Sequence, residues 1–387
     1  MSARPVPLID LQAQHAAIRD VVMPAVQAVI ERQQFIMGPE VRDLESAIAR
    51  LSRVPHGIGC ASGTDALILP LRALDLRPGD EVITPAFTMG ATATAVHNAG
   101  GTPVFVDVDR ASFNVTPDAI EVAMTPRTRA IIVVHLFGQM APMEEILNLA
   151  ERKSVPVLED AAQAIGAQRN FGGRGGAWRR AGETGWAASL SFFPTKNLGC
   201  WGDGGMILTR DDGLAERLRR LRVHGGLRKY FHEEVGTNSR LDTIQAAVLL
   251  AKLPFLEAWS AARRRHAEWY TDRFSAQGDV TPPWVDPANE PIFHQYTIRA
   301  PRRDELLQHL NARGIGCAVY YPLALHLQPC FAHLGHRPGS LPEAEAATRE
   351  VLSLPVYPEL TDAQREAVAS AVLEFYGGKG VGGGRKA

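Results

Sequence analysis

The sequence predicts an α/β protein with a mainly parallel sheet that is covered by helices on both faces. Short apolar runs such as 81–84, 102–108 and 129–136 indicate strands, and segments with apolar residues at helical spacing separate them. This alternation favours a parallel sheet, because parallel strands need a crossover connection. In such sheets ligands bind beyond the carboxyl ends of the strands.

Most of these units lie in the first two thirds of the chain. An arm and a helix are expected in residues 1–37, and a second helix at 41–51. The strands expected after them are 57–60, 81–84, 102–108, 129–136, 155–159, 190–193 and 206–209. The helices expected between them are 65–74, 88–98, one that begins at Pro117 with Thr116 as its N-cap, and 143–153.

The pattern changes after Leu241. A long helical region is expected from there to about Phe274, with an interruption at Pro254. A smaller α+β unit follows, with expected strands at 294–299 and 317–320 and expected helices at 304–313, 343–352 and 361–375. We therefore predict a large domain at 1–255 and a small C-terminal domain at 256–376. Residues 377–387 have too little apolar surface to order themselves, so a disordered tail is expected there.

Composition narrows the classes of function. The 387 residues are 45% hydrophobic and 21% charged, and the net charge of -1 argues against a nucleic-acid partner. No apolar run approaches the roughly 18 residues of a membrane span, and the N-terminus lacks the apolar core of a signal peptide. The four cysteines show neither a CxxC pair nor a histidine at zinc spacing. We expect a reduced, cytoplasmic protein without a structural metal and without a membrane partner.

Lys196 is the one lysine in the apolar and glycine-rich run 189–205. An apolar strand leads to it and Pro194 ends that strand. A lysine held against low-dielectric surroundings loses part of its preference for the charged form, and a neutral amine can form a Schiff base with a carbonyl. The alternative interpretation is an ordinary lysine in a surface turn.

A second candidate feature is Ser62-Gly63-Thr64, which opens a helix directly after a strand. Backbone N–H groups at the positive end of a helix bind phosphate, and the two hydroxyls can add hydrogen bonds. The alternative is a plain N-cap. Ser191, on the strand before Lys196, is a further candidate phosphate donor, or else a solvated strand serine.

Asp160 ends the apolar run that begins at Val155. A carboxylate at the end of a buried strand is costly unless it is paired. A pyridinium nitrogen would pair it well, and a ring kept protonated is a better electron sink. The alternative is an aspartate that caps the next helix.

Five motifs together resemble one family. They are Cys60-Ala-Ser-Gly-Thr-Asp-Ala-Leu67, Leu158-Glu-Asp-Ala-Ala-Gln163, Phe192-Phe-Pro-Thr-Lys-Asn-Leu-Gly199, Gly202-Asp-Gly-Gly205 and Asn238-Ser-Arg-Leu-Asp-Thr-Ile-Gln-Ala-Ala247. In this order they resemble the DegT/DnrJ/EryC1/StrS sugar aminotransferases, which use pyridoxal 5'-phosphate and have the aspartate aminotransferase fold (fold type I). The resemblance runs from Ile9 to about Glu374 and implies a large αβα domain plus a smaller α+β domain.

The resemblance also implies roles for single residues. Lys196 resembles the lysine that forms the internal aldimine, Asp160 the partner of the pyridinium nitrogen, and Gln163 the side chain near the ring hydroxyl. Gly63, Thr64 and Ser191, with Ser62 beside them, resemble the phosphate ligands. Asn238 resembles an asparagine that reaches the phosphate from the neighbouring subunit, which implies a homodimer with shared active sites. Arg240 resembles a residue at the substrate mouth; the alternative is a structural ion pair.

Three departures from the family pattern bear on the site. Met89 stands where an aromatic residue usually stacks on the cofactor ring, although a thioether also contacts rings favourably. Tyr320-Tyr321-Pro322 replaces the frequent His-Tyr-Pro, which puts that histidine's sugar contact in doubt. The Gly/Arg-rich piece 169–180 is longer than expected, and a solvated, partly disordered loop is favoured over a mobile flap that would supply cations for a diphosphate.

The predicted reaction moves the amino group of glutamate to a nucleotide-linked keto-sugar for polysaccharide or amino-sugar biosynthesis. The predicted substrate is a UDP-3-keto-hexuronic acid, which would be aminated at C3. The alternative substrate is a 3-keto or 4-keto dTDP-deoxysugar. A non-catalytic regulatory homologue is a further alternative. A dehydratase is disfavoured because family dehydratases replace the lysine with histidine. The candidate substrate contacts are Arg228, Lys229, Arg240, Tyr320, Tyr321 and His326.

Overall fold

A seven-stranded sheet forms the centre of the computed structural model, which describes residues 5–228, 230–276 and 278–377. In spatial order its strands are β1 (His56–Cys60), β9 (Gly205–Thr209), β8 (Ala187–Ser191), β5 (Val157–Asp160), β4 (Thr128–Val134), β2 (Glu81–Pro85) and β3 (Thr102–Val106). Strand β9 is antiparallel to both of its neighbours, and β8, β5, β4, β2 and β3 run parallel. The predicted mainly parallel sheet is confirmed.

Helices cover both faces of this sheet, because its strands are apolar on both sides. Val82, Ala130 and Ile132 face a core that includes residues of three helices, α3 (Gly63–Arg72), α4 (Gly90–Asn98) and α7 (Asp212–Leu221). Ile83, Ile131 and Val133 face the opposite core. That core includes residues of α2 (Pro39–Leu51), α5 (Pro117–Ala123), α6 (Met143–Lys153) and α8 (Thr243–Lys252). The alternation of neighbouring residues between two cores produces the αβα layering.

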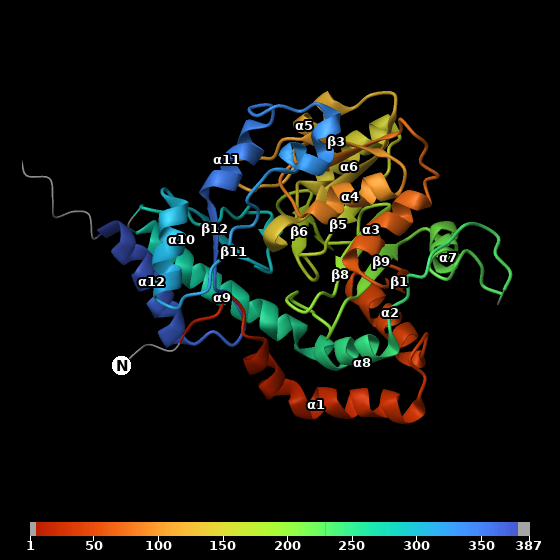
Figure 1. The fold of residues 1–387 in the computed structure, drawn as a ribbon, viewed down its shortest axis with the longest axis horizontal. Coiled ribbons are helices and arrows are strands. Elements are labelled where there is room, and N and C mark those ends of the chain that lie inside the picture. Colours follow the sequence, from red (N-terminus) through yellow and green to blue (C-terminus); the bar gives the residue numbers. More distant parts are fainter. Residues whose placement is uncertain (1–4, 229, 277, 378–387) are drawn as a thin grey trace, which may run out of the picture.

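A helical connection leads from the sheet to the C-terminal elements, and the N-terminal helix lies alongside it (Figure 1). Helix α1 (Leu11–Arg32) packs along α8 through a cluster that contains Val22 and Val248. The helical region after Leu241 is interrupted as predicted, by a short 3-10 segment at Leu253–Phe255 around Pro254. Helix α9 (Leu256–Ser275) then continues toward the C-terminal elements.

Most C-terminal elements gather around a third core. They are α10 (Arg303–Ala312), α12 (Asp362–Gly377) and the antiparallel pair β11 (Tyr296–Arg299) and β12 (Val351–Leu354). Helix α11 (Pro342–Glu350) instead contributes Ala344 and Ala347 to a core of the large sheet. The predicted strand at 317–320 is wrong: only Ala318 forms an isolated bridge, to Ser353. Strand β11 pairs instead with β12. The first two residues of β12 were predicted as the end of the helix 343–352.

The segment 169–180 is ordered, which corrects the prediction of a partly disordered loop. Strands β6 (Gln168–Phe171) and β7 (Ala177–Arg180) form a hairpin, and β6 also pairs with β10 (Asn289–Glu290). Arg169 is 6% exposed, and its Nη1 donates to Asp286 Oδ2 at 2.7 Å. This buried ion pair ties the hairpin to a segment more than a hundred residues away, a contact that composition does not reveal.

The N-cap that was predicted at Thr116 is present in the structure. Thr116 accepts a hydrogen bond from the backbone N–H of Ala119, so it caps α5 as predicted. Helix α7 was not expected from the sequence. The boundary at residue 255 remains a prediction, and the predicted tail lies outside the described residues from 378 onward. Among the described residues, the helices are too short or too polar to cross a membrane.

Candidate active site

A cavity of about 300 Å³ lies at the carboxyl ends of the parallel strands. Val134 at the end of β4, Asp160 at the end of β5 and Ser191 at the end of β8 all line it. It also brings together predicted residues from well-separated parts of the chain: Ser62, Gly63, Thr64, Met89, Gln163, Lys196, Tyr320 and Tyr321. The rule that ligands bind at this edge of a parallel sheet therefore describes this cavity.

Lys196 lies in the loop after β8, with its backbone N–H bonded to the carbonyl of Phe193. Its side chain is half-buried, and burial lowers the pKa of its amine to about 8, although the charge of Asp160 opposes this shift. Near neutral pH a measurable fraction of this amine is therefore neutral and nucleophilic. The alternative of an ordinary surface lysine does not fit this environment.

Asp160 is 5% exposed and is held at both oxygens. Oδ2 accepts from the hydroxyl of Thr92 at 2.9 Å, and Oδ1 accepts from the backbone N–H of Ala162 at 3.2 Å. Turns rather than a helix follow Asp160, so the alternative that it caps a helix is wrong. A buried carboxylate at a cavity wall is suited to pairing with a protonated ring nitrogen.

Ser62, Gly63 and Thr64 form the start of α3 beside Ser191. Ser62 Oγ accepts from the backbone N–H of Asp65, so the N-cap interpretation is correct for this serine. A Cβ at Gly63 would lie 2.6 Å from Ser191 Cβ, and one at Gly205 would lie 2.2 Å from the carbonyl oxygen of Ser62. The two glycines thus permit a close approach of the helix start to β8 and to β9, which leaves a compact N–H-rich corner suited to a phosphate.

Gln163 and Tyr321 form a polar pair on another wall. The backbone N–H of Phe137 donates to Gln163 Oε1 at 2.7 Å, which fixes the amide so that Nε2 donates to Tyr321 Oη at 3.0 Å. Burial raises the pKa of the Tyr321 phenol, so it stays protonated and can donate a hydrogen bond. Tyr320 and Met89, which is 52% exposed, complete this part of the wall.

The cavity also contains residues that the sequence did not single out. His294 is one of them, and its Nδ1 lies 3.0 Å from Asn197 Oδ1. Because Asn197 Nδ2 already donates to the carbonyl of Ile292, its oxygen is the acceptor and His294 Nδ1 carries the proton. Burial and the charge of Lys196 lower the pKa of His294 well below its usual range. A neutral imidazole therefore stands at the cavity wall.

Three predicted contacts lie elsewhere in the single chain. Arg228, Asn238 and Arg240 do not line the cavity. Arg228 belongs to the loop after α7, which projects from the body of the molecule (Figure 1). The predicted contact Lys229 lies outside the described residues. Asn238 forms an isolated bridge with Val223 at the base of this loop. The role of Asn238 in a second subunit's site remains a prediction, as do the substrate contacts of Arg228, Lys229 and Arg240.

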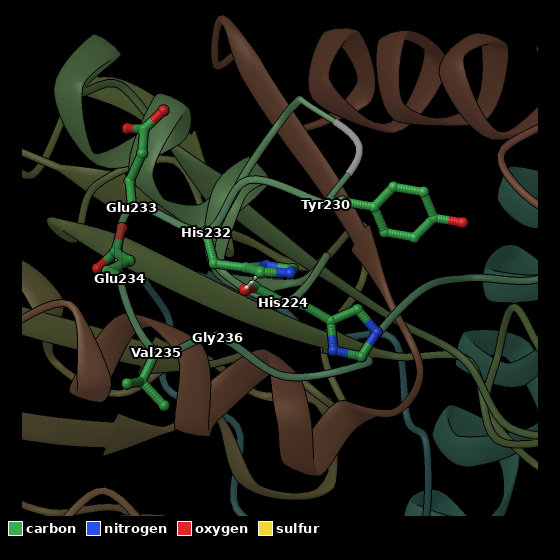
Figure 2. A pocket seen from close by; sticks show the side chains of 7 residues that line it. All are labelled: His224, Tyr230, His232, Glu233, Glu234, Val235 and Gly236. Carbon is green, nitrogen blue, oxygen red and sulfur yellow. Dashed lines mark hydrogen bonds between the residues drawn. The ribbon is translucent and has the colours of Figure 1, made fainter.

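The loop after α7 forms a shallow depression of its own (Figure 2). His232 Nδ1 lies 2.8 Å from the carbonyl oxygen of His224, and Tyr230 extends to the opposite side from Glu233 and Glu234. Tyr230 is 81% exposed. The loop is thus held by internal contacts and presents an aromatic side chain outward.

The predicted substrate contact of His326 does not fit the structure. This side chain is 1% exposed, and its Nε2 lies 3.1 Å from Glu345 Oε1. The same carboxylate accepts from the backbone N–H of Gly339. His326 therefore holds the segment around 339–345 and has no face toward the cavity.

The family model for DegT/DnrJ/EryC1/StrS aminotransferases matches residues 17–373. The chain belongs to this family. A solved structure of Streptomyces venezuelae DesV in complex with a ketimine intermediate superimposes with a TM-score of 0.92 at 43% identity, over 96% of this chain and 99% of DesV. The predicted family, fold type and aminotransferase class are confirmed.

Curated relatives carry two kinds of name. A "pleiotropic regulatory protein" of Geobacillus stearothermophilus is 52% identical over 96% of this chain and 98% of its own length. A UDP-N-acetyl-3-dehydro-α-D-glucosamine 3-aminotransferase of Acidithiobacillus ferrooxidans is 46% identical over 95% of this chain and 97% of its own. A UDP-2-acetamido-2-deoxy-3-oxo-D-glucuronate aminotransferase of Pseudomonas aeruginosa is 42% identical over 94% and 98%.

The residues of the cavity fit pyridoxal phosphate, the cofactor of this family. Lys196 would provide an amine for the aldehyde, Asp160 a carboxylate for the ring nitrogen, and the corner at Gly63 backbone donors for the phosphate. The predicted cofactor is confirmed at the level of the family.

Proposed function

We propose that this protein transfers the amino group of glutamate to C3 of a UDP-linked 3-keto-hexuronic acid, with pyridoxal phosphate as cofactor. The observation that carries the proposal is the shared cavity of Lys196 and Asp160, one a lysine with a pKa near 8 and the other a buried carboxylate. When bound, the cofactor supplies an electron sink for the carbanion of the amino donor.

Lys196 would hold the aldehyde of the cofactor and would also serve as the base. A pKa of about 8 suits its free amine to both accepting and releasing a proton at neutral pH. His294 lies at the same wall with a depressed pKa, so it stays neutral and does not add a positive charge beside this amine. The lowered pKa lets Lys196 take a proton from the donor carbon and then release it to another atom.

The other residues of the cavity bind and orient. Asp160 provides the negative charge opposite a protonated ring nitrogen, and its burial excludes water from that contact. Gln163 and Tyr321 hold fixed donors near the ring edge. The N–H groups at the start of α3, together with Ser191, hold a phosphate at the opposite end.

The negative charge of the proposed substrate favours an active site that is shared between two subunits of a homodimer. A nucleotide-linked hexuronic acid carries a diphosphate and a carboxylate, yet Lys196 is the one cationic side chain that the described residues place in the cavity wall. The missing positive charge would come from Arg228, Lys229 and Arg240 of a second copy. Leu227, Tyr230, Phe231 and Val235 are each more than half exposed on the same loop, which suits burial against a partner. The cytoplasm remains the predicted location.

Two measurements test this function. Purified protein with pyridoxal phosphate should convert glutamate to 2-oxoglutarate in a single half-reaction, and the aminated enzyme should then turn over UDP-3-keto-hexuronate. UDP-3-keto-N-acetylhexosamine and dTDP-ketosugars serve as competing acceptors. Comparable or greater turnover of another acceptor would overturn the hexuronate assignment, and absence of the glutamate half-reaction would overturn the aminotransferase assignment.

The regulatory name of one relative supports an alternative in which the chain binds the cofactor without catalysis. The two functions differ in the proton-transfer step. A regulator needs no base with a pKa near 8 beside a buried carboxylate, whereas a transaminase needs both. Detection of an amino-sugar product would exclude the non-catalytic alternative directly.

A further inference from the structure

A chain of two hydroxyl groups leads from the cavity wall to Asp160. Thr88 lines the cavity and is 2% exposed, and its Oγ1 lies 3.2 Å from Thr92 Oγ1. Thr92 is fully buried in the first turn of α4, and its Oγ1 lies 2.9 Å from Asp160 Oδ2. Neither threonine was among the residues expected at the site.

The direction of both hydrogen bonds follows from their chemistry. An ionised carboxylate can only accept, so the hydroxyl of Thr92 donates its single proton to Asp160. Thr92 then has no proton left for Thr88, and Thr88 must donate to Thr92. Each donation polarises the next hydroxyl, and this strengthens the final bond to the carboxylate.

We infer that Thr92 is a positioning residue that holds Asp160 for the ring nitrogen of the cofactor, and that Thr88 reinforces it. Of the three side-chain and backbone donors that the described residues place on Asp160, Thr92 is the nearest: Ala162 N–H lies at 3.2 Å and Ser189 Oγ at 3.5 Å. Asp160 is nearly inaccessible to water, so a lost hydroxyl there is not easily replaced. The inference rests on the proposed cofactor.

A neighbouring threonine shows that burial alone does not require this bond. Thr84 on β2 is also fully buried, and its hydroxyl has no hydrogen-bond partner among the described residues. Replacing each threonine by valine removes a hydroxyl at almost constant volume. Thr84→Val is therefore a matched control for Thr92→Val, because it changes the same chemistry on an adjacent element without touching Asp160.

The test measures the dissociation constant of pyridoxal phosphate for the apo-protein, with the pH dependence of the bound cofactor's absorbance. A hydrogen bond to a charged group contributes about 1.5–3 kcal/mol, so Thr92→Val should weaken binding by roughly 10- to 100-fold. Thr92→Ser keeps the donor and should remain within about threefold of the wild type by the same reasoning. Thr84→Val should leave both readouts unchanged, and Thr88→Val should weaken binding less than Thr92→Val.

A double-mutant cycle separates positioning from general destabilisation. If Thr92 acts through Asp160, Thr92→Val should add little to the loss caused by Asp160→Asn. Unchanged binding in Thr92→Val, or equal losses in Thr92→Ser and Thr92→Val, would overturn the inference. Thr92→Ala replaces the valine variant if the latter does not fold. Failure of the wild type to bind the cofactor would instead overturn the proposed function, so the two failures are distinguishable.

Discussion

The chemistry of Lys196 arises from its surroundings more than from its identity. Burial lowers the pKa of this amine to about 8, while the nearby carboxylate of Asp160 works against the shift. The sequence predicted the residue because an isolated lysine stands in an apolar and glycine-rich run. The neutral His294 beside it was missed, because its contact with Asn197 joins residues 97 positions apart.

The lowered pKa of Lys196 has a measurable cost for stability. The unfolded chain binds its proton with a pKa of 10.5 and the folded chain with one of about 8, so the cost is complete below pH 8 and disappears as the pH rises toward 10.5. Lys196→Met should therefore raise the free energy of unfolding of the apo-protein at pH 7 by up to about 3 kcal/mol. Chemical denaturation at pH 7 and pH 10 measures this.

A matched control replaces an exposed lysine. Lys153 has a side chain that is 45% exposed on α6, so Lys153→Met should show no comparable gain at pH 7. A gain for Lys196→Met that persisted undiminished at pH 10 would show that packing rather than charge is responsible.

At the scale of elements, the hydrophobic pattern predicted most of the regular strands and helices, although it missed α7 and wrongly predicted a strand at 317–320. Helix α6 was predicted with its exact bounds, and the Pro254 interruption was anticipated because proline acts locally. The hairpin at 169–180 and the pairing of β11 with β12 were not predicted. Both depend on partners far along the chain, such as Asp286 for Arg169, and periodicity carries no information about such partners.

Strand β5 depends on a second buried carboxylate, Glu159, next to Asp160. Glu159 Oε2 lies 2.8 Å from Nε2 of His135, the residue that directly follows β4. The same carboxylate accepts hydrogen bonds from the backbone N–H groups of Gly182, Thr184 and Gly185, which precede β8. The backbone N–H of His135 in turn donates to the carbonyl of Asp160. Glu159 therefore links β5, which ends at Asp160, to the segment that leads into β8 and on to Lys196.

Glu159→Gln should destabilise the protein by roughly 3 kcal/mol at pH 7, because an amide cannot accept all of these bonds and leaves buried donors unpaired. The hydrogen bond from His135 and those from the backbone lower the pKa of Glu159 despite its burial. Its stabilisation is thus present at neutral pH and lost as the pH falls below its ordinary 4.5. Urea denaturation at pH 7 and pH 4 measures the difference.

The exposed Glu151 on α6 provides the control, since Glu151→Gln should change the free energy of unfolding by less than about 0.5 kcal/mol. Equal effects of the two substitutions would contradict the assigned role of Glu159.

For the whole molecule, the described residues of one chain place Lys196 and Asp160 in a shared cavity, but they place no further lysine or arginine there. Family resemblance placed Asn238 in a partner's site, and the structure places Asn238, Arg228 and Arg240 outside the cavity of their own chain. No pattern within one chain can show a contact between two chains. The contribution of a second subunit to the site therefore stays a prediction, and the sequence reached it only through family resemblance.

Subunit complementation tests the shared site. Lys196→Ala and Asn238→Ala homodimers should each have little activity, and mixed dimers should regain one intact site, since the two residues would then come from different chains. Random exchange should restore about a quarter of wild-type sites, because half of the dimers are mixed and each has one intact site. Activity after unfolding and refolding the two variants together, compared with each refolded alone, measures this. Absence of any recovery would show that Lys196 and Asn238 of one site come from the same chain.

The central claim is that Lys196 binds the cofactor covalently. Borohydride reduction of the protein with pyridoxal phosphate, followed by digestion and mass spectrometry, locates the bond. We predict a phosphopyridoxyl group on the peptide that contains Lys196, at close to one per chain. A group on a different lysine, or none on this peptide while the protein remains folded, would contradict the account.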